Sequence, residues 1–178
     1  KYMNELLTNF VTLNASLLSV AISFFLFGYI FLDKFKPLKF ELFEWFPDPQ
    51  IVFEFYLDGL SGVMMVLICT LSLVIQLFST SYMSKDEKYT KYFEYFNFFV
   101  FSMLLLVLSG NFLVMFFGWE LVGLSSYLLI SFWSEKKSAS KAGNKAFILN
   151  RIGDFGFLIG LMMILNYFET FNFLSIFE

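Results

Sequence analysis

Histidine is absent from this sequence, and cysteine occurs once, as Cys69. The chain therefore holds no zinc-finger ligand set, no Cys-rich iron–sulfur site and no histidine-based catalytic site. Cys69 lies in an apolar run, which favours a buried, unreactive thiol. With one arginine, Arg151, and a net charge of −3, the chain lacks the basic footprint of a nucleic-acid-binding protein. We predict no nucleic-acid partner and no cofactor or metal held by this chain.

Charge of either sign is scarce. Charged residues make up 15% of the chain, whereas a soluble domain carries about 25%. Apolar residues make up 58%, and phenylalanine alone occurs 28 times among 178 residues. A water-soluble globule of this size cannot cover so much apolar surface. The composition excludes a soluble enzyme, a disordered tail and a disulfide scaffold, and it predicts an all-α membrane protein.

Five apolar stretches are each long enough to cross a bilayer core of about 30 Å as a helix. They cover residues 10–32, 57–79, 92–109, 111–133 and 146–168. Ser109, Gly110 and Asn111 predict a tight turn, so the third and fourth stretches form an antiparallel pair. The alternative, in which two stretches are buried helices of a soluble protein, is disfavoured because these stretches lack polar faces.

These stretches divide the chain into four parts. Residues 1–32 hold the first transmembrane helix, 33–56 form a loop, 57–168 form a four-helix part, and 169–178 are a short end. With five spans, one side of the membrane carries eight lysines and the other carries three. By the positive-inside rule the eight-lysine side faces the cytoplasm or the mitochondrial matrix. Its lysines are Lys1, Lys85, Lys88, Lys91, Lys136, Lys137, Lys141 and Lys145.

The loop after the first span has an alternating pattern. Residues 39–42 alternate polar and apolar side chains, Pro47, Asp48 and Pro49 supply a turn, and the β-rich run 51–55 follows. This pattern predicts a short β-hairpin on the outer face. The alternative is an amphipathic loop without regular structure.

Glu120 lies near the middle of the fourth predicted span, about 3 Å from the midplane at the rise of a helix. A charge at such a depth costs about 2.5–3.5 kcal/mol on insertion scales, so it indicates function or a partner. No cation lies within a turn of Glu120 on its own helix. The carboxyl group is therefore protonated, paired with a cation from another helix, or hydrated. A proton relay is favoured over a fixed ion pair.

Arg151 and Asp154 lie inside the fifth predicted span, whereas Asp58 and two lysines lie at or near the ends of spans. Arg151 and Asp154 share a helix face, either as a structural pair or as a pair that changes the field at a neighbouring site. Lys141 and Lys145 also share a face, either as anchors for lipid phosphates or as the lining of a proton entry path. Asp58 is expected to cap the second span. Gly153, Gly156 and Gly160 predict close helix packing.

Four runs resemble a known family. They are YLDGLS at 56–61, SYM at 81–83, GWELVGLSSYLLI at 118–130 and NRIGDFG at 150–156. In this order and spacing they resemble NADH dehydrogenase subunit 5, the antiporter-like membrane subunit of respiratory complex I. The resemblance covers most of the chain from residue 53 to about residue 165.

The resemblance implies a helical bundle built from inverted five-helix repeats, and proton translocation coupled to ubiquinone reduction elsewhere in the complex. Glu120 matches the mid-membrane glutamate of proton transfer, and Arg151 and Asp154 match the charged motif on the following helix. Lys141 and Lys145 match basic residues that precede this motif. The loop 33–57 matches the hairpin that contacts a neighbouring antiporter-like subunit. FMN, iron–sulfur clusters and ubiquinone are expected elsewhere in the complex, and the mitochondrial inner membrane is the expected location.

Family members are several times longer than this chain. They also carry a membrane-embedded lysine that pairs with the glutamate, and these 178 residues contain no such lysine. The resemblance therefore implies the N-terminal part of such a subunit, either as a fragment or as one product of a split gene whose second chain supplies the lysine. Two other functions stay open. One is a bacterial-type cation/proton antiporter subunit in a plasma membrane, and the other is a non-conducting membrane scaffold.

Overall fold

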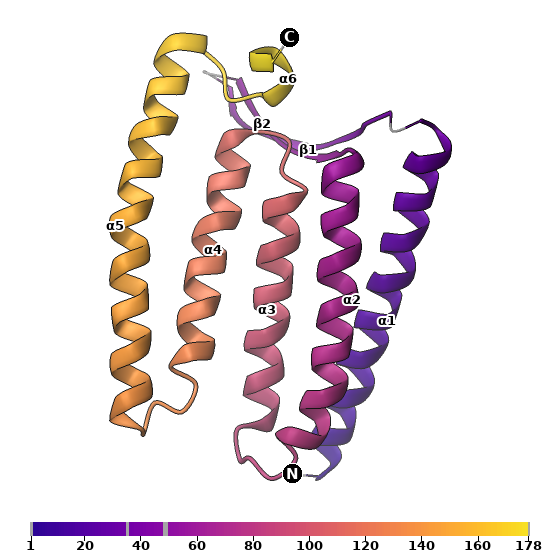
Figure 1. The fold of residues 1–178 in the computed structure, drawn as a ribbon, viewed down its shortest axis with the longest axis vertical. Helices are drawn as coiled ribbons and strands as arrows, with labels where there is room; N and C mark the ends of the chain where they lie inside the picture. Colours follow the sequence, from indigo (N-terminus) through magenta and orange to yellow (C-terminus); the bar gives the residue numbers. More distant parts are fainter. Residues whose placement is uncertain (1, 35, 48–49, 178) are drawn as a thin grey trace.

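Five long helices dominate the computed structural model, which describes residues 2–34, 36–47 and 50–177. Helices that follow one another in the chain pack side by side, and a two-stranded hairpin lies across one end of the bundle (Figure 1). The predicted fold class, a helical membrane protein with a small hairpin, is confirmed. The elements are α1 (Tyr2–Leu32), β1 (Leu38–Pro47), β2 (Gln50–Leu57), α2 (Gly59–Tyr82), α3 (Tyr89–Val107), α4 (Phe112–Ile130), α5 (Lys137–Phe168) and α6 (Phe173–Phe177).

Four of the described helices are long and apolar enough to cross a membrane by length and composition. They are α2, α4, α5 and the Glu5–Leu32 part of α1. α3 has 19 residues but is less apolar, because Lys91, Glu94 and Asn97 lie in its first half. It packs between α2 and α4, so the bundle keeps the predicted five-helix order.

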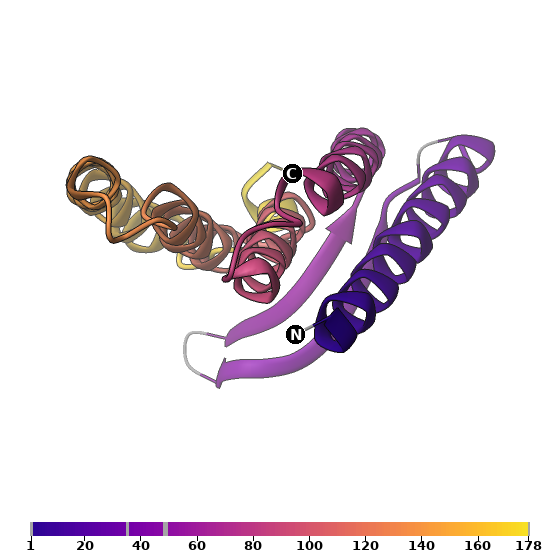
Figure 2. The same cartoon turned by 90° about the horizontal axis from the view of Figure 1, so that it is seen from below.

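The hairpin runs along one side of α3 when the bundle is seen along its helices (Figure 2). Its antiparallel register places Leu38 opposite Leu57 and Glu41 opposite Glu54. Irregularities after Glu41 and after Glu44 interrupt the ladder and bend the strand. Of the predicted turn, residues 48 and 49 lie outside the described residues.

Two side chains fix where helices begin at the hairpin end. Asp58 accepts a hydrogen bond from the backbone N–H of Ser61, and the Ser61 hydroxyl accepts one from the backbone N–H of Asp58. This reciprocal pair is a capping box, so the predicted cap of the second span is confirmed. Asn111 caps α4 through the backbone N–H of Val114 and marks the predicted tight turn between α3 and α4.

The glycines of α4 and α5 differ in how closely other residues pack against them. A Cβ on Gly118 of α4 would lie 2.7 Å from the backbone nitrogen of Leu106, so α3 and α4 approach closely at this point. On α5, by contrast, nothing in the described residues lies within 4 Å of a Cβ on Gly153, Gly156 or Gly160. The predicted packing face of α5 is therefore open within the described part of the chain.

Candidate functional site

Glu120 of α4 meets Arg151 of α5 in the middle of the bundle. The Arg151 guanidinium forms an ion pair with the Glu120 carboxylate, and its Nη2 donates a hydrogen bond of 3.4 Å to the Glu120 carbonyl oxygen. The Nη1 of Arg151 also lies 3.7 Å from Oδ2 of Asp154, one turn further along α5. One guanidinium therefore lies between carboxylates of two helices.

Asp154 has a second partner, which the sequence did not indicate. The indole Nε1 of Trp119 donates a hydrogen bond of 2.9 Å to Oδ1 of Asp154. Asp154 is only 5% exposed, and a buried carboxylate is costly unless it is paired and hydrogen-bonded. Trp119 thus belongs to the cluster. In the sequence, the signal for this role was a side chain with an N–H donor directly before Glu120 in a membrane span.

Aromatic rings and open space surround this cluster. The Arg151 guanidinium lies over the ring of Phe147, 4.8 Å from its centroid, which adds a cation–π contact. Within the described residues, Nε of Arg151 is buried and has no hydrogen-bond partner. A cavity between α3, α4 and α5 adjoins the carboxylate of Asp154. Its lining includes Trp119, Gly123, Ser126, Asn150, Gly153 and Asp154.

The charge balance of the cluster suits proton exchange. Two carboxylates share one guanidinium, which is always protonated in proteins. The three groups therefore carry an excess of one negative formal charge when both carboxylates are ionised. The same geometry also fits a fixed buried pair, the alternative that the sequence left open.

Lys141 and Lys145 lie outside this cluster. Both are exposed on the first turns of α5, which begins at Lys137, nine residues before the predicted span. At the rise of a helix, Lys145 lies about 9 Å and Lys141 about 15 Å from Arg151 along the axis. Among the described residues, the cation beside Glu120 is Arg151.

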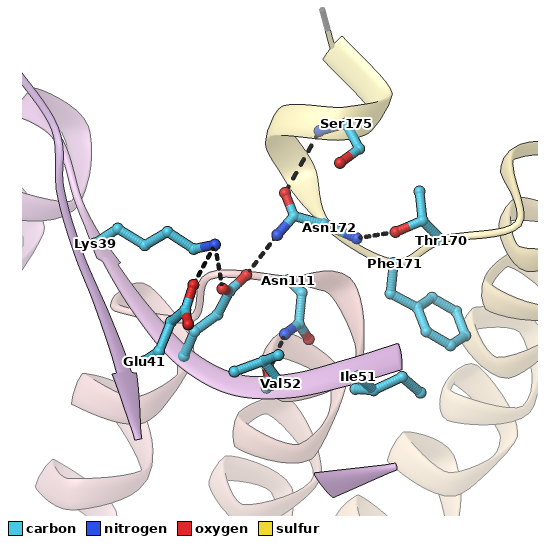
Figure 3. Close-up of a pocket in the computed structure, with 10 residues that line it drawn as sticks. Lys39, Glu41, Ile51, Val52, Asn111, Thr170, Phe171, Asn172 and Ser175 are labelled. Atoms are coloured by element: carbon cyan, nitrogen blue, oxygen red, sulfur yellow. Dashed lines mark hydrogen bonds and ion pairs between the residues drawn. The ribbon is translucent and has the colours of Figure 1, made fainter. Parts of the chain in front are cut away.

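A second polar cluster lies at the hairpin end, where Lys39 and Asn172 contact Glu54 of β2 (Figure 3). The Glu54 side chain is 2% exposed, and its Oε2 lies 2.8 Å from Nζ of Lys39. The same ammonium lies 3.0 Å from Oε1 of Glu41. Both carboxylates, Glu54 first, raise the pKa of Lys39 above its ordinary value. Sequence patterning predicted a strand here but not this buried carboxylate.

Residues distant in sequence close the Glu54 cluster. The amide of Asn172 donates a 2.7 Å hydrogen bond to Oε1 of Glu54, and the backbone N–H of Gly110 donates a 3.0 Å bond to the Glu54 carbonyl oxygen. A Cβ on Gly110 would lie 2.5 Å from Cγ of Glu54, so the turn needs glycine at this position. The hairpin, the α3–α4 turn and residues 170–175 therefore line one polar pocket.

Two family models match this chain. One, described as the N-terminus of chain 5 of NADH-ubiquinone oxidoreductase (complex I), matches residues 45–93. The other, described as the NADH:quinone oxidoreductase/Mrp antiporter transmembrane family, matches residues 109–178. The chain belongs to the complex I subunit 5 family. The resemblance drawn from the sequence motifs is thereby confirmed.

Curated members of the subunit 5 family are similar to most of this chain. NADH-quinone oxidoreductase subunit L of Rickettsia bellii is 41% identical over 72% of the chain and 20% of its own length. NADH-ubiquinone oxidoreductase chain 5 of Acanthamoeba castellanii is 40% identical over 95% of the chain and 25% of its own length. The chloroplastic NAD(P)H-quinone oxidoreductase subunit 5 of Adiantum capillus-veneris is 41% identical over 87% of the chain and 22% of its own length. The chain spans about a quarter or less of these relatives, and it corresponds to the N-terminal portion of subunit 5.

Two solved structures share the fold of this subunit 5 portion. An archaeal membrane-bound sulfane sulfur reductase aligns with a TM-score of 0.80 at 21% identity, over 92% of this chain and 33% of its own. An Mrp complex from Dietzia aligns with a TM-score of 0.71 at 20% identity, over 93% of this chain and 20% of its own. In the described residues, no group of three or more Cys, Asp or Glu is placed to hold a metal ion.

Proposed function

We propose that this chain is the N-terminal part of a proton-translocating membrane-arm subunit of NADH:ubiquinone oxidoreductase, with Glu120 as the group that takes up and releases the proton. The observation that carries the proposal is the sharing of Arg151 between Glu120 and Asp154. This chain supplies no redox centre. FMN, iron–sulfur clusters and ubiquinone belong elsewhere in the complex.

The proposed cycle depends on the position of the Arg151 guanidinium. While it is paired with Glu120, that carboxylate is ionised. When Arg151 moves toward Asp154, which Trp119 already orients through its indole N–H, Glu120 loses its counter-charge and accepts a proton. The return of Arg151 to Glu120 expels this proton. Asp154 and Arg151 therefore modulate the affinity of Glu120 for the proton.

Protons reach Glu120 from the lysine-rich end of the bundle. Lys141 and Lys145 mark the entry on α5, where their ammonium groups also bind lipid phosphates. The rest of the subunit, in the same polypeptide or in a second chain, covers the open side of α5 and supplies a lysine that faces Glu120. The hairpin contacts a neighbouring antiporter-like subunit. We place the complex in the mitochondrial inner membrane.

The test is the variant Glu120→Gln in the assembled complex, reconstituted into liposomes. Gln keeps the shape of the side chain and removes the titratable proton. We expect NADH-driven acidification of the lumen to fall at least about a hundredfold, the lower end of the range for loss of a positioned proton-transfer group. Glu120→Asp is the control and retains part of the pumping. Wild-type pumping by Glu120→Gln contradicts the relay and favours the non-conducting scaffold.

A cation/proton antiporter is the second candidate, because the family model over residues 109–178 includes Mrp antiporters. Purification from membranes in mild detergent, with mass spectrometry of every chain, separates the two. Association with NADH-oxidising subunits supports the complex I subunit, whereas migration without such subunits supports the antiporter.

A further inference from the structure

The α4–α5 side of the bundle changes from polar to apolar and back to polar along its length. At the hairpin end lies the pocket around Glu54, and in the middle lies the cluster of Glu120, Arg151 and Asp154. A buried apolar cluster separates the two. Its buried members are Ile51, Leu161 and Phe171, which are 8%, 0% and 5% exposed.

The apolar cluster is thick enough to stop protons when it is dry. From Asn111, which lines the Glu54 pocket, to Trp119 is eight residues of α4, or about 12 Å. Phe116 and Phe157 fill this interval with an edge-on contact of 5.3 Å between ring centroids, and Phe157 also packs on Trp119. Hydrophobic constrictions of this kind gate permeation by losing and regaining water.

The Glu54 pocket has the composition of a proton-release site. Its carboxylate is buried, and Glu54 lines the pocket, which gives the carboxylate a route to water. Lys39 lies within ion-pair distance of both Glu54 and Glu41, so its ammonium has an alternative partner when Glu54 becomes neutral. Asn172 holds the other carboxylate oxygen and fixes its direction (Figure 3).

We propose that Glu54 is the outer proton-release group of this module, and that Ile51, Leu161 and Phe171 form the gate between it and the mid-membrane cluster. This inference rests on the proposed function. A chain of about four waters, spaced at about 2.8 Å, bridges the gate when it opens. The proton passes from the mid-membrane cluster to Oε2 of Glu54, and Lys39 shifts to Glu41. When Lys39 returns, the proton leaves Glu54 for the water outside, and the site regains its starting charge.

The variant Glu54→Gln tests the proton-release role of Glu54 while keeping the hydrogen bonds that join the hairpin to the bundle. The Gln side chain still accepts the hydrogen bond from Asn172, and the bond from Gly110 uses the backbone oxygen, so the tie between hairpin and bundle survives. In the assembled complex in liposomes we expect pumping to fall about a hundredfold, with Glu54→Asp restoring part of it. If Glu54 serves only as a tie, Glu54→Gln pumps like the wild type, and the release role is overturned.

Leu161→Asn tests the gate, because an amide in the apolar cluster holds water there. Without NADH, we expect liposomes with this variant to lose an imposed pH gradient several times faster than wild-type liposomes. Leu158→Asn, at a 38% exposed position of the same helix, is the matched control. If Leu161→Asn prevents assembly, Ile51→Thr in the hairpin replaces it. Equal leak rates for the gate variant and the control overturn the gate.

Combined variants distinguish failure of this inference from failure of the proposed function. Adding Glu54→Gln to the leaky gate variant should slow the leak, because the leaking proton also passes Glu54. If Glu120→Gln abolishes pumping while Glu54→Gln does not, the proposed function stands and the release site lies elsewhere. If neither variant changes pumping, the proposed function itself fails.

Discussion

Gly118 offers a sharp test of how closely α3 and α4 must approach beside the charge cluster. Replacement by Ala adds a Cβ that lies 2.7 Å from the backbone nitrogen and 2.8 Å from the Cα of Leu106. Ordinary contacts begin at 3.4 Å, so the helices must separate by about 0.7 Å. The obstacle is backbone, which cannot rotate out of the way as a side-chain end can.

The magnitude follows from two opposing effects. Overpacking of this kind costs about 1–3 kcal/mol, whereas replacing Gly by Ala inside a helix stabilises it by about 1 kcal/mol. Gly28→Ala on α1 is the matched control, because no described atom lies within 4 Å of its added Cβ and only the helix gain applies. Gly118→Ala should therefore be less stable than Gly28→Ala by about 1–3 kcal/mol.

The assay is heating of the purified assembly in detergent, with the melting temperature read from the loss of folded complex. Gly118→Ala should melt below the wild type or near it, and clearly below Gly28→Ala. Because Gly118 lies two residues before Glu120, we also expect slower pumping for Gly118→Ala. Equal melting temperatures for the two variants would refute the close approach of α3 and α4.

Three further predictions concern caps and charges. Asp58→Ala should destabilise the chain by about 1 kcal/mol through loss of the α2 cap, and Asp58→Asn should not; melting temperatures check this. Trp119→Phe keeps a ring but leaves Oδ1 of Asp154 without its donor, so we expect a loss of about 1–3 kcal/mol and slower pumping. Glu135 raises the pKa of Lys88, and Lys88 lowers that of Glu135. Their contact should persist from neutral to mildly basic pH, weaken as acid protonates Glu135 or strong base deprotonates Lys88, and weaken in salt. Spin labels on the two loops measure this, and mobility that ignores both pH and Lys88→Gln would contradict it.

The sequence predicted the helices and the hairpin because both depend on local pattern. Long apolar runs mark spans, and the alternation around residues 39–55 marks strands. The predicted span 146–168 lies within α5, which begins nine residues earlier, at Lys137. The early part of α5 contains Lys and Ala, which form helices readily, but its Lys, Ser and Asn residues keep it from being apolar. Hydropathy locates the membrane, and it does not locate the first turn of a helix that continues into water.

The side-chain partners were harder to predict than the elements. Spacing on one helix indicated that Arg151 and Asp154 lie near each other, but the ion pair of Arg151 with Glu120 depends on how α4 and α5 are rotated. The burial of Glu54 depends on residues 110 and 172, which are 56 and 118 positions away in the chain. Contacts of this range leave no periodic pattern in a single sequence.

The length of α5 sets a requirement on the surrounding bilayer. Its 32 residues span about 48 Å, while the 19 residues of α4 span about 28 Å, and α5 extends past α4 at both ends (Figure 1). Toward the hairpin side, this extension carries exposed Met162, Met163 and Tyr167. A bilayer that matches α4 leaves these side chains above its hydrocarbon core. They are covered by the rest of the subunit, by locally thicker lipid or by a tilt of the helix, and the last two cost a fraction of a kcal/mol per Å of mismatch. Membrane thickness therefore influences the tilt of α5, the helix that carries Arg151 and Asp154.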